Sequence, residues 1–136
     1  MKILLVSHGK FAEGLRDTMV DFFGATNIYA ACVTQENGTD GLRSAVEEYL
    51  AGWGEDEQVI ICSDMMGGSA NQTVYPYMAR PNTYLVAGMN LPLVMQLHLE
   101  PDGVSAEFLR EIIEISQSGI VLVNDKDFSA VGEDDE

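Results

Sequence analysis

A histidine stands where the first apolar run of the chain ends. The segment from Lys2 to Ser7 is almost wholly aliphatic, which is typical of a strand buried on both faces of a parallel sheet. His8 and Gly9 follow it directly, and Gly9 allows the backbone to turn closely into a helix. Open α/β sheets bind ligands at the carboxyl ends of their strands. His8 is therefore a candidate nucleophile, general base or metal ligand, or a residue that only ends the strand.

A carboxylate follows a second apolar run, Val59 to Ser63, in the same way. Asp64 comes at its end. Because the carboxyl ends of parallel strands meet at one edge of a sheet, we expect Asp64 and His8 to be neighbours. A carboxylate that accepts the proton of one ring nitrogen fixes the tautomer and leaves the other nitrogen nucleophilic. It also stabilises the cation that forms when that nitrogen is phosphorylated or protonated.

Two glycines and a serine, Gly67-Gly68-Ser69, come next and lead into an expected helix. Glycines permit close backbone approach, and the N–H groups at a helix N-terminus favour an anion. This pattern predicts a pocket for a phosphoryl group facing His8. Lys10 is the only basic residue of these loops, so backbone dipoles and hydroxyls would hold the anion, as suits a reversible carrier. The structural alternatives are that Asp64 or Ser69 only caps a helix and that the glycines only form a tight turn.

Strands and helices alternate along the chain that must position these residues. Apolar runs predict strands at 2–7, 28–33, 59–63 and 83–87 and a short last strand, Ile120 to Val123; helical spacing predicts helices at 10–23, 40–53, 70–79, 91–99 and 105–116. Pro76 should kink or shorten the third helix. This order predicts a single doubly wound α/β domain, residues 1–124, with a mainly parallel four-stranded sheet, a short C-terminal edge strand and helices on both faces. The last strand would pair at an edge or exchange with another subunit.

Composition limits the classes of function. The 136 residues suit one domain, and 22 acidic against seven basic residues give a net charge of −15. Such a surface disfavours nucleic acid and anionic lipid. Its acidity either serves solubility alone or steers a basic protein partner to the molecule. Residues 125–136 form an acidic tail of disordered composition. Cys32 and Cys62 lie in apolar runs, so we expect core residues and no metal site. The chain shows no secretory signal and no membrane-spanning run, so we expect a cytoplasmic location.

Three motifs, each weak alone, together resemble one known family. They are Ser7-His8-Gly9, the run from Asp64 to Asn71, and the run from Ala87 to Pro92. In this order they resemble the mannose-type enzyme IIA component of the bacterial phosphoenolpyruvate-dependent sugar phosphotransferase system, over about residues 2 to 123. That family often has a proline after the serine, where this chain has Ala70, a difference that affects helix entry more than chemistry.

The resemblance implies a phosphotransferase that works as a phosphohistidine carrier. His8 would accept a phosphoryl group from phospho-HPr and pass it to enzyme IIB, with the membrane components IIC and IID further along the pathway. Asp64 would hydrogen-bond the active histidine, and Gly67, Gly68 and Ser69 would form the phosphoryl-binding loop, with no cofactor or metal. The resemblance further implies a homodimer, with residues 120–123 as the exchanged edge strand, and a free-standing IIA. The sugar stays open.

Other readings of the same residues also stay open. A receiver-like signalling domain would be phosphorylated on Asp64, although the acidic cluster that holds its Mg²⁺ is missing after the first strand. A flavodoxin-type module would need a Ser/Thr-rich phosphate loop there, and a Ser69-His8-Asp64 hydrolase would need a G-x-S-x-G elbow. A purely regulatory protein that senses phosphorylation is a further alternative, which family resemblance does not separate from a transport role.

Overall fold

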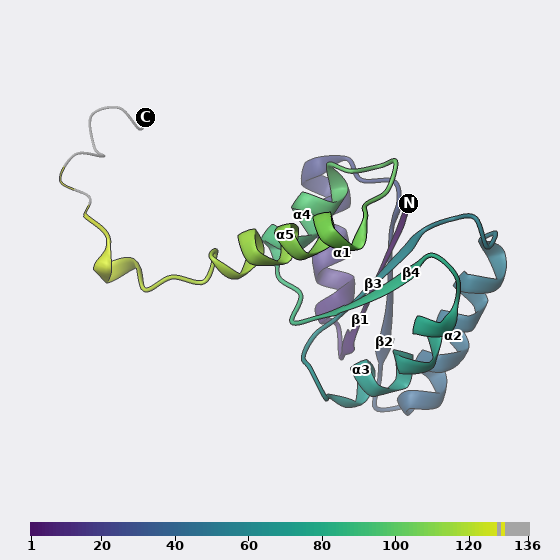
Figure 1. Cartoon of the computed structure of the whole chain (residues 1–136). Helices are drawn as coiled ribbons and strands as arrows, with labels where there is room; N and C mark the ends of the chain where they lie inside the picture. The colour runs from purple at the N-terminus through teal and green to yellow at the C-terminus, as the bar shows by residue number, and fades with distance from the viewer. Residues whose placement is uncertain (128, 130–136) are drawn as a thin grey trace.

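Four parallel strands form the centre of the molecule, in the order β2-β1-β3-β4. They belong to a computed structural model that describes residues 1–127 and 129 (Figure 1). The strands are β1 (Lys2–His8), β2 (Ile28–Val33), β3 (Val59–Ser63) and β4 (Thr83–Ala87). The α-helices of the described residues are α1 (Phe11–Phe23), α2 (Gly38–Gly52), α3 (Ser69–Val74), α4 (Leu91–His98) and α5 (Ala106–Gln117), with 3₁₀ turns η1 (Tyr75–Ala79) and η2 (Val123–Asp125).

The strand order contains one switch point, between β1 and β3. From β1 the chain moves outward to β2, returns to β3 on the other side of β1 and moves outward again to β4. Val6 pairs with Ser63, the last residue of β3, so β1 continues past β3 and ends at His8. The switch point of an open α/β sheet leaves a crevice at the carboxyl ends of its strands. His8 lies at this crevice.

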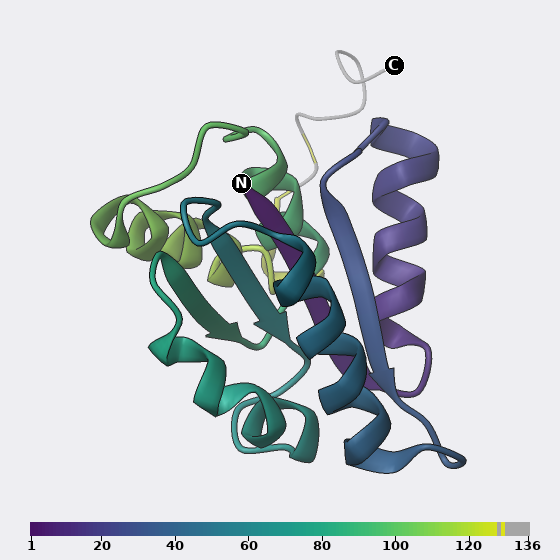
Figure 2. The ribbon, with the colours of Figure 1, turned by 90° about the vertical axis from the view of Figure 1, so that its right-hand side faces the viewer.

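Helices cover both faces of the sheet, as the alternation of side chains in β1 requires. Ile3 and Leu5 belong to the core cluster under α1, α4 and α5, whereas Leu4 and Val6 belong to the cluster under α2 and α3. All four side chains are fully buried. Figure 2 shows the sheet between these two layers of helices. The predicted doubly wound fold is therefore confirmed.

Two helices differ by more than one residue from their predicted limits. The third predicted helix is shortened as expected, because Pro76 has no N–H for an α-helical bond and the chain continues from Val74 as the 3₁₀ turn η1. Helix α2 begins at Gly38, two residues before the predicted start, and the N–H of Gly41 already donates to the carbonyl of Asn37 in its first turn (3.0 Å).

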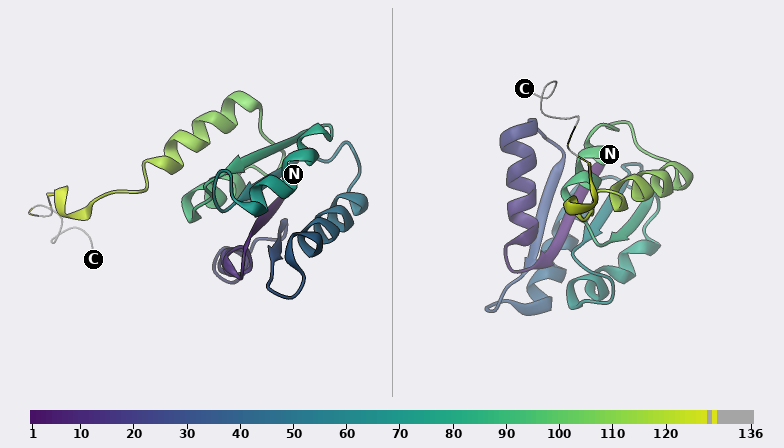
Figure 3. Two further views of the ribbon diagram at one scale, coloured as in Figure 1. Left: turned by 90° about the horizontal axis from the view of Figure 1, so that it is seen from below. Right: turned by 90° about the vertical axis from the view of Figure 1, so that its left-hand side faces the viewer.

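The predicted edge strand at residues 120–123 is not formed within the single chain. Residues 120–122 have no regular structure, and Val123 begins η2. Figure 3 shows this segment leaving α5 and extending away from the sheet. A strand needs a hydrogen-bonded neighbour, and the segment extends away from the four strands of the described residues. The segment is nevertheless apolar and exposed, with Ile120 81% and Leu122 63% accessible. Most of the predicted acidic tail, 128 and 130–136, lies outside the described residues.

The two cysteines differ in burial. Cys62 is completely buried in β3, and burial raises the pKa of its thiol to about 12. Cys32, on the edge strand β2, is half-buried and packs against the core, so the predicted core position is confirmed for Cys62 and only in part for Cys32. Neither cysteine forms a disulfide. Within the part of the chain that the structure describes, no helix has the length and apolar character to cross a membrane.

Candidate functional site

The end of β1 and the start of the β3–α3 loop place a histidine against a carboxylate. The Nδ1 atom of His8 lies 2.8 Å from Oδ2 of Asp64, and the backbone N–H of His8 donates to the same oxygen at 3.0 Å. Asp64 immediately follows Ser63, so it reaches the last residues of β1 at the switch point. The imidazole is 48% exposed and the carboxylate 14% exposed. The structure thus brings together the two residues that the sequence placed at one sheet edge.

Asp64 is held in its ionised form by three N–H donors. Partial burial by itself would raise its pKa, but the bonds from the backbone and ring of His8 and from the backbone N–H of Met65 (2.8 Å) outweigh burial. The pKa of Asp64 therefore lies below its ordinary 3.8. A carboxylate only accepts hydrogen bonds, so the proton between the two side chains belongs to His8 Nδ1.

The other ring nitrogen of His8 faces a hydroxyl. Its Nε2 atom lies 2.5 Å from Oγ of Ser69, the first residue of α3. With the proton on Nδ1, Nε2 has a free lone pair and accepts the O–H of Ser69. A neutral imidazole in this tautomer is a nucleophile, and the carboxylate stabilises the positive charge that develops when Nε2 forms a bond.

The turn between Asp64 and Ser69 gives the histidine ring its free space. Gly67 has a φ of +80°, a left-handed conformation that favours glycine. A Cβ atom on Gly68 would lie 3.6 Å from Cε1 of His8 and 2.9 Å from Cγ of Met65, so the missing side chain leaves room beside the ring. The N–H of Gly67 donates to Oδ1 of Asn71 (3.0 Å) and is therefore engaged within the turn.

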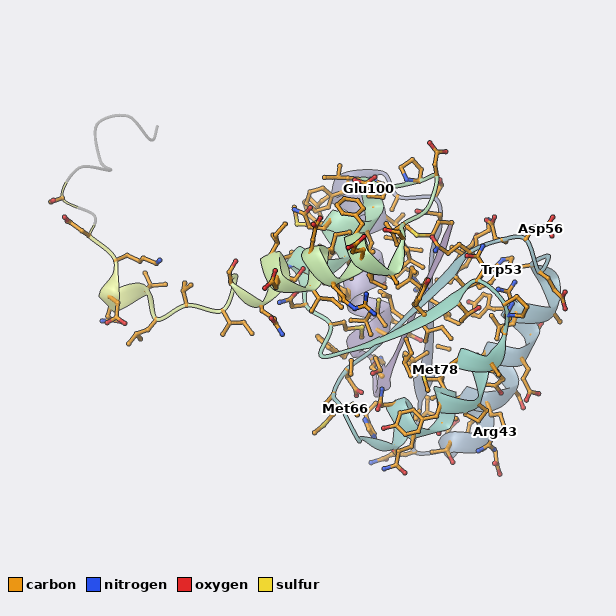
Figure 4. The ribbon with its side chains drawn as sticks, in the orientation of Figure 1. Arg43, Trp53, Asp56, Met66, Met78 and Glu100 are labelled. Atoms are coloured by element: carbon orange, nitrogen blue, oxygen red, sulfur yellow. The ribbon has the colours of Figure 1, made fainter. Side chains whose placement is uncertain are left out.

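His8 lies beside an open cavity and near exposed apolar side chains. A cavity of about 780 Å³ lies beside it, between the β1–α1 connection and the loop that follows β2. Large apolar side chains are exposed in the segments that adjoin His8: Phe11, at the start of α1, by 51%, and Met65 and Met66, in the β3–α3 loop, by 58% and 73%. Figure 4 shows Met66 extending outward from the loop before α3. An accessible nucleophilic nitrogen with an exposed apolar rim suits group transfer from another macromolecule.

The third motif of the sequence, the run from Ala87 to Pro92, supports the edge of the sheet and has no hydrogen bond to His8 in the structure. The N–H groups of Gly88 and Met89 donate to the carbonyl of Ser63, at 3.1 and 3.0 Å. Asn90 caps α4 through Leu93 N–H (2.9 Å), and its Nδ2 donates to the carbonyl of Ser116 in α5 (3.0 Å). These residues therefore fix the end of β3 and the adjoining helices.

Sequence reasoning missed the buried polar pair behind the loop. Ser63 is fully buried and Asn71 is 1% exposed, and the two side chains are bonded at 2.8 Å. The available signal was a serine ending a fully apolar strand together with an asparagine within the first turn of the next helix. Neither residue type is usually buried without a partner.

Comparison with known proteins gives the following sequence relatives. The family model described as the fructose IIA component of the phosphotransferase system matches residues 2–114. The sorbose-specific EIIA component of Klebsiella pneumoniae is 25% identical over 121 residues, which cover 88% of this chain and 89% of that protein.

Solved structures extend the likeness to the fold. A putative phosphoenolpyruvate-dependent sugar phosphotransferase system permease from Klebsiella pneumoniae superposes with a TM-score of 0.78 at 26% identity, over 91% of each chain. The mannose/sorbose-specific IIA subunit of Enterococcus faecalis has the same fold, with a TM-score of 0.80 at 22% identity over 93% of this chain and 96% of that one. The family model spans most of the chain, and the chain therefore belongs to the mannose-type family of enzyme IIA components of the sugar phosphotransferase system.

Proposed function

We propose that the protein is a phosphocarrier that accepts a phosphoryl group on Nε2 of His8 from phospho-HPr and passes it to enzyme IIB. The observation that supports this most directly is that the two ring nitrogens of His8 have different hydrogen-bond partners. Asp64 holds the proton on Nδ1, while Nε2 faces the hydroxyl of Ser69 at a half-exposed position. Membership of the enzyme IIA family supplies the class of reaction.

The proposed step is an in-line displacement. The lone pair of His8 Nε2 forms a bond to phosphorus as the N–P bond of the donor's phosphohistidine breaks, and that bond's electron pair returns to the donor's ring nitrogen. The proton on Nδ1 stays in its bond to Asp64, which stabilises the charge on the phosphorylated ring. The donor is already activated, so positioning and electrostatic support are sufficient and no cofactor or metal is needed. Transfer to enzyme IIB repeats the displacement in the other direction.

The loop before α3 would hold the phosphoryl group. In this proposal the hydroxyl of Ser69 turns from Nε2 to a phosphoryl oxygen, and Gly67 and Gly68 shape the turn that keeps the space beside the ring open. Gly68 is the closer of the two glycines, because a side chain there would reach the imidazole. Ser69 is the only side-chain hydroxyl recorded in contact with Nε2 among the described residues.

The surroundings of His8 suit protein partners. A net charge of −15 would attract a basic docking surface on HPr, and the exposed methionines beside His8 supply adaptable apolar contacts. We propose a cytoplasmic role in carbohydrate uptake, in which enzyme IIB connects the carrier to the membrane components IIC and IID.

We further propose that the protein works as a homodimer. The exposed apolar segment at residues 120–123 has no partner strand among the described residues, and an exchange between subunits would give it one. Sedimentation equilibrium measures the mass directly. A dimer that becomes a monomer in Leu122→Asp supports the proposal, and a monomeric wild-type protein at working concentration contradicts it.

A phosphorylation assay tests the proposed function. The protein is incubated with labelled phosphoenolpyruvate, enzyme I and HPr, and the label is mapped and challenged with acid and with alkali. We expect HPr-dependent, acid-labile label on Nε2 of His8, and two-dimensional NMR distinguishes this nitrogen from Nδ1. His8→Ala should abolish the label, whereas His98→Gln, a change of the second histidine of the chain, should keep it.

Two results would contradict the proposal. The first is stable label on His8→Ala, which would remove the assigned acceptor. The second is an alkali-labile acyl phosphate on Asp64, which would favour the receiver-like alternative. Label on His8 that never passes to any enzyme IIB would instead indicate the regulatory role.

A further inference from the structure

The loop beside His8 is fastened from behind by one buried amide. Asn71 accepts the N–H of Gly67 at Oδ1 (3.0 Å) and donates from Nδ2 to Oγ of Ser63 (2.8 Å). Asn71 is 1% exposed and Ser63 is fully buried. Both ends of the amide are thus used, and water has little access to replace either bond. Removing one partner would leave a buried polar group unpaired, which is destabilising.

A second side chain holds the carbonyl of the same glycine. Nε2 of Gln72 donates to the oxygen of Gly67 at 2.6 Å, from an exposed position on α3. Gly67 therefore has its N–H and its C=O bonded by two successive residues of one helix. These bonds hold Gly67 at a φ of +80°. A free glycine adopts positive φ values about as readily as negative ones, so the two bonds select this conformation.

The geometry of Gly67 determines what faces the histidine. Gly68 and Ser69 follow it directly; the first lies against the imidazole ring and the second bonds its Nε2 atom. The far end of the connection is equally fixed, because Ser63 ends β3 and its carbonyl accepts the N–H groups of Gly88 and Met89. A change at Gly67 would therefore displace Ser69 rather than the strand.

We propose that Asn71, supported by Gln72, is the positioning residue of the phosphoryl-binding loop: it sets the distance between Ser69 and Nε2 of His8 without touching the phosphoryl group. The inference rests on the proposed function. A displacement of a reacting group by about 1 Å can lower a reaction rate by roughly 100-fold. The positioning acts on the transfer step and leaves the docking of HPr unaltered, because Asn71 is buried and Gln72 bonds inward to the turn.

The test uses full-length variants in single-turnover transfer from phospho-HPr. We expect Asn71→Ala to lower the transfer rate by up to about 100-fold with an unchanged concentration of donor at half-saturation. Gln72→Ala should lower it by a smaller factor. Ser116→Ala is the control: it too removes a hydrogen bond of a buried side chain, but one within α5 (to the Ile112 carbonyl, 2.7 Å) and away from the loop. Its rate should stay at the wild-type value.

A second readout does not depend on activity. The amide proton of Gly67 should exchange with solvent faster in Asn71→Ala than in the wild-type protein, and at the wild-type rate in Ser116→Ala. If Asn71→Ala does not fold, Gln72→Ala applies the same test from an exposed position where the change favours the helix.

The outcomes are separable. Wild-type transfer rates in folded Asn71→Ala and Gln72→Ala would overturn the inference, and so would a change confined to the half-saturating donor concentration. A rate loss equal to that of Ser116→Ala would also overturn it, because it would reflect stability alone. Absence of label on wild-type His8 would contradict the proposed function instead, and Gly67 exchange would still decide whether Asn71 holds the turn.

Discussion

Replacing Asp64 by asparagine tests most directly whether Asp64 keeps the ring proton of His8 on Nδ1 and leaves Nε2 as the nucleophile. The carboxylate accepts three N–H donors: the backbone and ring of His8 at Oδ2, and the backbone of Met65 at Oδ1. An amide of the same shape has one oxygen and one NH₂ group. If the oxygen faces His8, the NH₂ group opposes the N–H of Met65. If the NH₂ group faces His8, it opposes the backbone N–H and donates to Nδ1, which moves the ring proton to Nε2.

Either orientation of the amide weakens phosphoryl transfer. With the NH₂ group facing His8, the ring proton moves to Nε2 and the nucleophile is protonated. With the oxygen facing His8, the negative charge that supports the phosphorylated ring is missing. A hydrogen bond to a charged group contributes about 1.5–3 kcal/mol, which corresponds to roughly a 10- to 150-fold lower transfer rate for Asp64→Asn. Transfer should be slowed and not abolished, because Ser69 still faces Nε2.

Single-turnover phosphorylation by phospho-HPr measures this effect. Asp17→Asn is a suitable control, because it removes one carboxylate of the acidic surface at a position 61% exposed and paired with Arg16. The control separates the loss of a local hydrogen bond from the loss of general attraction to the donor. A rate for Asp64→Asn within twofold of the control would refute the reasoning and leave Asp64 as a structural cap of the loop.

Three further predictions follow from the same structure. The pKa of Asp64 is lower in the folded protein than the ordinary 3.8, so its contribution to stability is complete above that pH and is lost as the pH falls through the folded value. The free energies of unfolding of wild-type protein and Asp64→Asn should therefore converge below pH 3.8. A difference that stays constant with pH would contradict this. Burial raises the pKa of Cys62 to about 12, so a thiol reagent at pH 8 should modify the half-buried Cys32 alone until the protein is denatured; two reactive thiols in the native state would be the opposite result. Gly67→Ala should lower the free energy of unfolding by about 1–2 kcal/mol because of the left-handed φ, and equal stability by denaturation would argue against that conformation.

The elements of this fold were largely predictable because their signals are local. Apolar runs such as Val59–Ser63 are too short and too continuous for surface helices, and all four runs of the central sheet form strands at their predicted positions. The effect of Pro76 on the third helix also follows from one residue, since proline lacks an N–H wherever it stands. The segment at residues 120–123 has an equally apolar sequence, yet a strand there depends on a partner strand that the described part of the chain does not supply.

The sequence by itself determined the chemical groups and the sheet edge at which they meet: a histidine, a carboxylate and a serine that follow buried parallel strands must converge at the switch point. Only the tertiary structure decided which ring nitrogen of His8 is bonded to Asp64 and which faces Ser69, because that choice depends on ångström-scale placement across the sheet. It also decided the role of Asn71, whose two partners lie before it on the loop and on the strand. Spacing in the sequence predicts which strand ends are neighbours, whereas packing of the helices onto the sheet sets the direction of each side chain.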